Sequence, residues 1–188
     1  MDAKGKVILI TGSTDGVGRM TAERLGAMGS EVLVHGRDAD RGREVVAGIE
    51  QAGGRARLFQ ADLASLAEVG RLADAVIAAT GRLDVLVNNA GIGSGGKDGR
   101  AESRDGHELR FAVNYLAGYV LARRLLPLVR ASAPSRIVNV SSIGQEAIDF
   151  DDVMLTRGYS GWRAYCQSKL AQVLLTIDLA DELKGSGV

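Results

Sequence analysis

The stretch from Val7 to Met28, VILITGSTDGVGRMTAERLGAM, decides the fold of this chain. Its first four residues are apolar, largely β-branched and followed at once by a glycine turn, which predicts a buried strand over residues 7–10. After Gly18 the apolar residues recur at helical spacing among polar ones, so we expect a helix there. A glycine turn between a strand and a helix N-terminus is typical of a diphosphate cradle, because the unpaired N–H groups and the helix dipole attract an anion.

The rest of the chain alternates between short β-branched runs and amphipathic stretches. The runs predict strands at residues 31–35, 55–60, 84–88 and 136–141, and the amphipathic stretches predict helices at residues 39–52, 65–80, 105–131 and 161–184. Unbroken alternation indicates a parallel sheet covered on both faces. With right-handed crossovers this becomes a Rossmann-like, doubly wound α/β fold with strand order 3-2-1-4-5, whose ligand crevice lies at the carboxyl ends of strands 1 and 4.

Length and composition favour a single cytoplasmic domain over residues 1–188. Lysine plus arginine equals aspartate plus glutamate, 23 each, so no net field attracts nucleic acid or an anionic membrane. The one cysteine, Cys166, excludes an internal disulfide and predicts a reducing compartment. The apolar runs are too short to span a bilayer. Five glycines within residues 91–99 predict a mobile loop and not a domain boundary, because the alternation resumes after it.

The glycine turn has an unusual spacing. It reads Thr11-Gly12-x-x-x-Gly16-x-Gly18, which differs from the G-x-G-x-x-G of ordinary dinucleotide folds. It resembles the cofactor motif of the short-chain dehydrogenase/reductase family. The resemblance implies that the turn binds a nicotinamide cofactor through Gly12, Ser13, Thr14, Asp15, Gly16, Val17 and Gly18. A purely structural strand-to-helix turn is the alternative that the motif by itself leaves open.

The tip of the second predicted strand, His35-Gly36-Arg37-Asp38, bears on the choice of cofactor. An acid there would accept from both adenosine ribose hydroxyls of NAD, whereas an arginine pairs with the 2′-phosphate of NADP. Arg37 stands where NADP-dependent relatives in the family carry their arginine, with Arg41 as support, while Asp15 argues for NAD. We therefore expect NADP, with NAD as the alternative cofactor. A surface arginine that starts a loop is the structural alternative for Arg37.

Two further motifs follow predicted strands. Asp62-Leu63 resembles the family's pair at the adenine ring, although an aspartate that caps the next helix is the simpler alternative. Asn88-Asn89-Ala90-Gly91 resembles the family's NNAG motif, in which adjacent amides bond across to neighbouring backbone beside the cofactor. The resemblance implies cofactor contacts from Asn89, Ala90 and Gly91.

Three segments suggest catalytic groups. Tyr165 and Lys169 lie four residues apart, so a helix places the phenol and the ammonium on one face. Ser142, in the run VNVSSIG, resembles the family's catalytic serine, with Ser141 as an alternative. Asn114, a poor helix former in an apolar stretch, resembles the helix asparagine that holds a water in the family's proton relay. A capping or kinking role is the structural alternative for Asn114.

These residue types suit carbonyl reduction or alcohol oxidation. Tyrosine titrates near ~10, so acid–base work at neutral pH asks for a shift of ~3 units, or ~4 kcal/mol. A lysine within a few ångströms supplies about that much at an effective dielectric near ~20. The resemblance implies that Tyr165 exchanges a proton with the substrate oxygen, that Ser142 holds this oxygen, and that Tyr165 and Lys169 also contact the nicotinamide end of the cofactor. Neither histidine has metal-ligand partners at a suitable spacing, so no metal is expected.

The segments AYCQSKLAQVLL and DELKGSGV, residues 164–175 and 181–188, resemble the retinol-dehydrogenase-like and protochlorophyllide-reductase-like branch of the family. We therefore expect an NADP(H)-dependent oxidoreductase that acts on a small or apolar alcohol or carbonyl compound. A non-catalytic nucleotide-binding remnant, or a fragment of such an enzyme, is the alternative. An epimerase or dehydratase of the related extended branch is disfavoured, because that branch spaces its glycines differently.

The family continues beyond the position of Val188 with a sixth strand and a substrate-binding segment, so we expect the family's last strands to be absent and leave the substrate unidentified. The strand at 136–141 would then lack one neighbour, and we expect the chain expressed alone to self-associate and to show negligible turnover. The helices that carry Asn114 and Tyr165 are the expected contact of a homo-oligomer.

Overall fold

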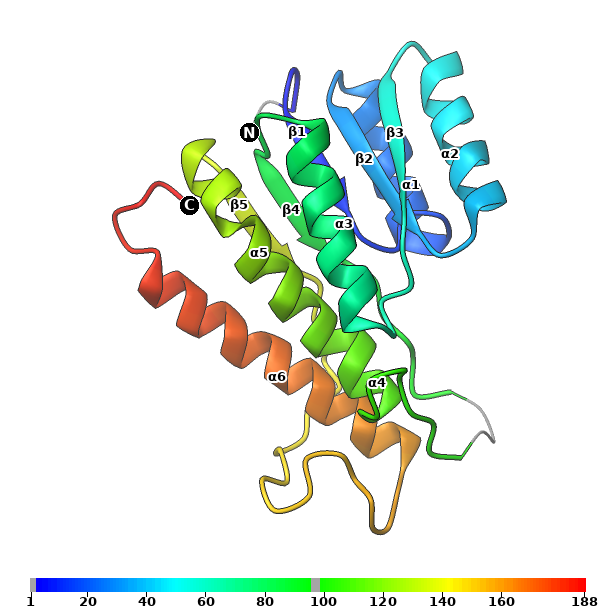
Figure 1. Cartoon of the computed structure of the whole chain (residues 1–188), viewed down its shortest axis with the longest axis vertical. Helices are drawn as coiled ribbons and strands as arrows, with labels where there is room; N and C mark the ends of the chain where they lie inside the picture. Colours follow the sequence, from blue (N-terminus) through cyan, green and yellow to red (C-terminus); the bar gives the residue numbers. More distant parts are fainter. Residues whose placement is uncertain (1–2, 96–98) are drawn as a thin grey trace.

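A parallel sheet organises the described part of the chain, residues 3–95 and 99–188 of this computed structural model (Figure 1). Its strands are β1 (Val7–Ile10), β2 (Glu31–Gly36), β3 (Arg55–Gln60), β4 (Val85–Asn88) and β5 (Arg136–Asn139). The order is β3-β2-β1-β4-β5 with every neighbouring pair parallel, which confirms the predicted doubly wound arrangement. β1 therefore lies in the middle of the sheet, paired with β2 and β4.

Helices cover both faces of this sheet. They are α1 (Gly16–Ala27), α2 (Ala39–Gln51), α3 (Leu66–Ala79), α4 (Leu109–Phe111), the π-helical turn η1 (Ala112–Leu116), α5 (Ala117–Ala131) and α6 (Gly161–Glu182). On one face, Ile8 and Ile10 of β1 pack in a cluster with side chains of α1 and α2. On the other, Val7 and Leu9 pack with side chains of α3, α5 and α6. Because both faces are covered, the strand reads as a continuous apolar run and does not alternate with polar residues.

Asp84, just before β4, ties together the amino ends of the two central strands. Its buried carboxylate accepts hydrogen bonds from Val7 N–H (2.9 Å), Lys6 Nζ (2.9 Å) and Arg82 Nε (2.8 Å). Burial raises the pKa of this carboxyl, but the hydrogen bonds from Arg82, Val7 and Lys6 outweigh burial and leave the pKa below its ordinary value. The opposite, carboxyl ends of β1 and β4 are thereby held in register, and those ends carry the site described below.

The helix expected from residue 105 begins only at Leu109, which corrects the sequence prediction. Asp105 serves another element, because its carboxylate accepts from Leu66 N–H (2.8 Å) at the start of α3. Gly106 has a φ of +79°, which a right-handed helix excludes. The next residues, 112–116, are π-helical, and the ordinary α-helix resumes at Ala117. Asn114 therefore lies in a π-helical turn, a feature that is frequent at functional sites.

The last strand is shorter than predicted, because β5 ends at Asn139 and not at Ser141. Val140 N–H still donates to Asn88 O (2.9 Å), but the chain then turns toward α6, where Ser141 Oγ donates to Lys169 O (3.2 Å). Among the described residues β5 pairs with β4 alone and forms an edge of the sheet. A cavity of about 490 Å³ lies between this edge and α6.

Two long connections gather at one end of the sheet: the one from β4 to α4, described over residues 91–95 and 99–108, and the one from β5 to α6, residues 140–160 (Figure 1). Residues 96–98 of the predicted glycine-rich loop lie outside the described residues. α6 ends at Glu182, slightly before its predicted end. Within the ranges that the structure describes, no helix combines the length and the apolar content needed to cross a membrane.

Candidate active site

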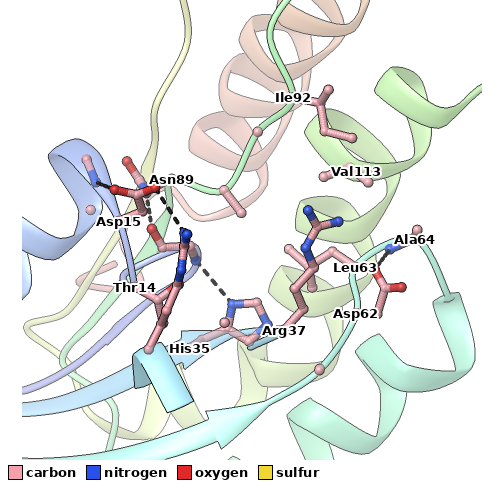
Figure 2. A pocket seen from close by; sticks show the side chains of 18 of the residues that line it. Thr14, Asp15, His35, Arg37, Asp62, Leu63, Ala64, Asn89, Ile92 and Val113 are labelled. Atoms are coloured by element: carbon pink, nitrogen blue, oxygen red, sulfur yellow. Dashed lines mark hydrogen bonds and ion pairs between the residues drawn. The ribbon is translucent and has the colours of Figure 1, made fainter. Parts of the chain in front are cut away.

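A cavity of about 510 Å³ opens at the carboxyl ends of β1, β2 and β4 (Figure 2). Its volume is in the range of small-molecule and cofactor sites. Twelve of the predicted cofactor residues line it: Gly12, Thr14, Asp15, Gly16, Val17, Gly18, Arg37, Asp62, Leu63, Asn89, Ala90 and Gly91. Ser13, Tyr165 and Lys169 are not in its lining. Thr14 and Asp15 stand on one side of the cavity, and Arg37 and Asp62 stand on the other (Figure 2).

The glycine turn lines the cavity and is closely packed. Two of its positions have no space for a side chain. Gly12 has a φ of +64°, and a Cβ there would lie 2.8 Å from Ala90 Cα. A Cβ on Gly18 would lie only 2.2 Å from Gly12 O. Asp15 is the N-cap of α1, and its carboxylate accepts from Gly16 N–H (2.7 Å). The first turn of α1 therefore faces the cavity, with room for a ligand to approach the backbone.

The loop after β4 braces this turn. Asn89 Nδ2 donates to Thr11 O (2.9 Å) and Gly12 O (3.1 Å). In return, Thr11 Oγ1 accepts from Asn89 N–H (3.0 Å) and Ala90 N–H (3.1 Å). The cross-bonding predicted for the Asn-Asn-Ala-Gly motif is therefore present, and it locks together the tips of β1 and β4 beneath the cavity.

His35 makes a contact that the sequence did not predict. From the tip of β2, its Nδ1 accepts from Gly12 N–H (3.1 Å), and its side chain lines the cavity. Burial lowers the pKa of His35 to about 4, so the imidazole is neutral at neutral pH. Ser13, a predicted cofactor residue, is instead fully buried: its Oγ donates to Ile10 O (2.8 Å) and accepts from His35 N–H (2.9 Å). Ser13 thus supports the turn from behind and does not reach the cavity.

Two arginines stand at the mouth of the cavity. Arg37 lines it from the end of β2 and has an exposed side chain. Arg41, on the first turn of α2, places Nη1 3.3 Å from Asp15 Oδ2. The acid that argued for NAD is therefore paired with an arginine. Arg37, by contrast, has no ion-pair partner in the part of the chain that the structure describes, so its guanidinium can meet an anionic ligand.

Asp62 and Leu63 line the cavity from the loop between β3 and α3. The N-cap of α3 is Ser65, as predicted, so Asp62 does not cap the helix. Its carboxylate instead accepts from Ala64 N–H (3.0 Å) and lies 3.7 Å from Arg104 Nη2. These contacts fix the loop that closes the side of the cavity opposite Thr14 and Asp15 (Figure 2).

Asn114 is almost fully buried and has all its side-chain bonds within the protein. Its Oδ1 accepts from Ile92 N–H (2.7 Å), and its Nδ2 donates to Ile92 O (3.1 Å) and Ser168 Oγ (3.0 Å). The side chain thus joins η1, the loop after β4 and α6. The structure thus gives the amide group a linking role, while its place in the proton relay stays a prediction.

Lys169 lies close to Gly91, one of the residues that line the cavity. Its Nζ donates to Val140 O (2.8 Å) and to Gln172 Oε1 (2.9 Å). It is also 5.9 Å from the centroid of the Tyr165 ring, so the ammonium lies near the ring of the predicted phenol. A Cβ on Gly91, which lines the cavity, would lie 3.6 Å from this Nζ. Burial lowers the pKa of Lys169.

The segment that carries Ser141 and Ser142 lies against α6. Ser141 Oγ is engaged with Lys169 O, whereas Ser142 Oγ accepts from Gly144 N–H (3.1 Å) within its own turn. A Cβ on Gly144 would lie 3.4 Å from Tyr165 Cε1, so this turn passes close to the phenol ring. The contacts favour Ser142 over Ser141 as the serine that is available beside Tyr165.

Comparison with known proteins identifies the family of the chain. The model of the short chain dehydrogenase family matches residues 6–188. Human retinol dehydrogenase 13 is 39% identical over 189 residues, which cover 98% of this chain and 56% of that protein. Mouse retinol dehydrogenase 11 is 38% identical over 188 residues, covering 98% and 58%. The predicted resemblance to the retinol-dehydrogenase-like branch is thus confirmed, and the chain spans about half the length of the curated relatives it matches.

Among solved structures, the fold is similar to that of a metagenomic short-chain oxidoreductase in complex with NADP. The TM-score is 0.82 and the sequence identity is 32%, and the match covers 100% of this chain and 80% of that one. At this similarity the two chains share the arrangement of strands and helices that surrounds the cavity.

Proposed function

The chain belongs to the short-chain dehydrogenase family, and from this membership and the geometry of its site we propose that it is an NADP-dependent oxidoreductase acting on an alcohol or carbonyl compound. One observation carries the proposal. Gly91 lines the cavity at the glycine turn, a Cβ on it would lie 3.3 Å from Asn114 Oδ1 and 3.6 Å from Lys169 Nζ, and this ammonium is 5.9 Å from the centroid of the Tyr165 ring. A nucleotide cradle and a phenol–ammonium pair therefore meet at one place.

The residues fit a nicotinamide dinucleotide. Gly12 and Gly18 let the turn pack closely on the loop after β4, while Gly16 lines the cavity and a Cβ there would meet nothing within 4 Å, so a diphosphate could approach its backbone. The N-terminus of α1 favours such an anion electrostatically. Arg37 would pair with the 2′-phosphate that distinguishes NADP from NAD, and Arg41 already neutralises Asp15. When bound, the nicotinamide would supply or accept the hydride.

Side chains of the protein would supply the proton transfer and hold the substrate. Tyr165 would exchange a proton with the substrate oxygen, and the nearby Lys169 cation would favour the phenolate form. Ser142 would hold the same oxygen through its hydroxyl. Asn114 keeps the loop after β4 joined to α6, so that the cradle and the phenol stay in a fixed relation.

An apolar substrate suits the surroundings of the phenol. The Trp162 ring is 6.1 Å from the Tyr165 ring and is largely exposed. Ile143, next to Ser142, is fully exposed. These side chains would cover an apolar part of the substrate beside the reacting oxygen.

A homo-oligomer formed through the helices of Asn114 and Tyr165 is also proposed. It is supported by the exposed apolar side chains of Tyr119 on α5 and of Leu174 and Ile177 on α6. The cytoplasmic location expected from the single Cys166 stays a prediction.

The proposal is tested by titrating the protein with NADPH and then following NADPH oxidation at 340 nm with a panel of apolar and polar aldehydes and ketones. We expect the chain to bind NADPH, and a form extended after Val188 by the family's C-terminal segment also to turn over at least one apolar carbonyl compound. Tight NADPH binding with no turnover by that extended form would instead favour the alternative of a nucleotide-binding protein without catalysis. No binding of either NADPH or NADH would overturn the proposal.

A further inference from the structure

The Lys169 ammonium lies in a pocket of neutral groups. Its side chain is only 5% exposed, and two of its three N–H bonds are used, one to Val140 O (2.8 Å) and one to Gln172 Oε1 (2.9 Å). Tyr165 on α6, Gly91 after β4 and Asn114 on η1 complete its surroundings. Among the described residues no carboxylate pairs with Lys169, and burial alone accounts for its lowered pKa.

Gln172 is itself buried, with 3% of its surface exposed, one turn beyond Lys169 on α6. Burying an amide is costly unless it is hydrogen-bonded, and the bond from Lys169 supplies that partner. Gln172 also borders a small cavity of about 10 Å³ together with Asn88 and Asn114. The glutamine is thus held between the lysine and the polar interior behind it.

We propose that Gln172 is a positioning residue for the reaction: its neutral amide oxygen fixes the direction of the Lys169 ammonium without cancelling its charge. The inference rests on the proposed function, in which that charge acts on Tyr165. With Val140 O and Gln172 Oε1 each taking one N–H, the third N–H is left for the side of Gly91, which lines the cavity.

The neutrality of the acceptor is the essential point. A carboxylate at this position would accept the same hydrogen bond, but its negative charge would oppose the field of the ammonium at the phenol. An apolar side chain would leave a buried N–H without a partner and would favour the uncharged amine. Of these three side chains, only the amide fixes the ammonium without opposing its field at the phenol.

The first test measures Lys169 directly, in cofactor-free protein labelled with ¹⁵N-lysine, by following the Nζ resonance against pH. The resonance is assigned by its loss in Lys169→Arg. We expect Gln172→Glu to raise the pKa of Lys169 by about one pH unit or more, and Gln172→Leu to lower it. Ala180→Glu is the matched control: it adds the same charge at an exposed position on the same helix and should leave Lys169 unchanged.

A raised lysine pKa in Gln172→Glu together with a lowered one in Gln172→Leu supports the proposal. A merely structural defect would not shift the pKa in opposite directions for a charged and an apolar replacement. Equal behaviour of Lys169 in Gln172→Glu and in the unmodified protein would overturn it. If Gln172→Leu does not fold, the test compares Gln172→Glu with the conservative Gln172→Asn. Only Gln172→Glu should raise the pKa of Lys169.

The second test is the pH–rate profile of alcohol oxidation, which needs the phenol as a base, measured in a form of the protein extended after Val188 by the family's C-terminal segment. Gln172→Glu should displace the profile toward alkaline pH, with NADP affinity changed less than threefold. An unshifted profile would overturn the positioning role. If the lysine responds as expected but Tyr165→Phe retains full turnover, the proposed function fails while the placement of Lys169 by Gln172 stands.

Discussion

The glycine turn at residues 11–18 and the segment at residues 140–146 both reach the candidate site, but they are fixed by different means. The turn follows β1, which has a strand on either side, and backbone or short polar contacts hold it to the tips of β2 and β4. The segment 140–146 follows the edge strand β5 and is held mainly by α6, through Lys169 and through close contact of Gly144 with the Tyr165 and Trp162 rings. One half of the site is therefore set by the sheet and the other by a single helix.

This difference predicts that the two halves fail separately. Changes on α6 should alter turnover and leave the nucleotide cradle intact, since no α6 residue lines the cavity in the part of the chain that the structure describes. Lys169 is the expected exception, because its ammonium is also expected to contact the nicotinamide end of the cofactor. Changes at the turn should remove nucleotide binding, and with it all activity.

The largest effect is expected from Tyr165→Phe, made in a form of the protein extended after Val188 by the family's C-terminal segment, because this variant changes the α6 half of the site alone. Turnover should fall about a thousandfold, because a proton-transfer group is lost. NADPH affinity, measured by isothermal titration calorimetry, should change less than twofold. Lys169→Ala is the contrasting variant and should weaken both quantities. Comparable turnover in Tyr165→Phe and the unmodified protein would show that another residue supplies the proton.

The next largest effect is expected from Gly18→Ala, which breaks the cradle. The added methyl would lie 2.2 Å from Gly12 O, so the turn must move. We expect NADPH affinity to fall about a hundredfold, or ~3 kcal/mol. Gly48→Ala on α2 is the control, because a Cβ there meets nothing within 4 Å, and it should stabilise the helix slightly. Unchanged affinity in Gly18→Ala would contradict the close-packed cradle.

The pH dependence of stability tests the cradle half separately, because His35 is hydrogen-bonded to Gly12 of the glycine turn. Its pKa is lowered from 6.5 to about 4 by burial, so the folded state resists protonation. Its contribution to stability is complete above pH 6.5 and is lost as the pH falls from 6.5 to about 4, a loss of about 3 kcal/mol in the free energy of unfolding.

His35→Asn keeps an acceptor for Gly12 N–H but cannot titrate. Urea unfolding at pH 7 and at pH 4 should therefore show a smaller acid loss in His35→Asn than in the unmodified protein. Equal losses in the two proteins would mean that His35 is not buried and neutral.

The smallest effect is expected at the rim, from Arg37→Asp. If Arg37 pairs with the 2′-phosphate, the unmodified protein should bind NADPH at least about tenfold more tightly than NADH, or ~1.4 kcal/mol. Arg37→Asp should erase this preference without affecting the turn. Coincident titration curves of the unmodified protein for the two cofactors would exclude the pairing.

The same division explains what could be predicted from sequence. The glycine turn, the strand order and the Ser65 cap depend on local patterns, and all three are present in the structure. Most of the predicted cofactor residues follow strand tips, which the doubly wound topology brings to one end of the sheet. The Tyr165–Lys169 pair needed only the helical spacing of four residues.

What the sequence missed depends on contacts between distant residues. The bond from Gly12 to His35 spans 23 positions, and no local pattern distinguishes His35 from an ordinary buried histidine. The start of α4 was misplaced because Asp105 bonds to α3. The π-helical turn at Asn114 and the burial of Ser13 likewise follow from packing partners that are remote in sequence.

The claim that the two halves share one bound nucleotide is tested most directly by hydrogen–deuterium exchange with NADPH and with 2′,5′-ADP, which lacks the nicotinamide half. We expect both ligands to slow exchange in residues 11–18, and NADPH alone to slow it in residues 140–146 and around Tyr165 and Lys169. Protection of residues 11–18 by NADPH without any change in residues 140–146 would contradict a shared site.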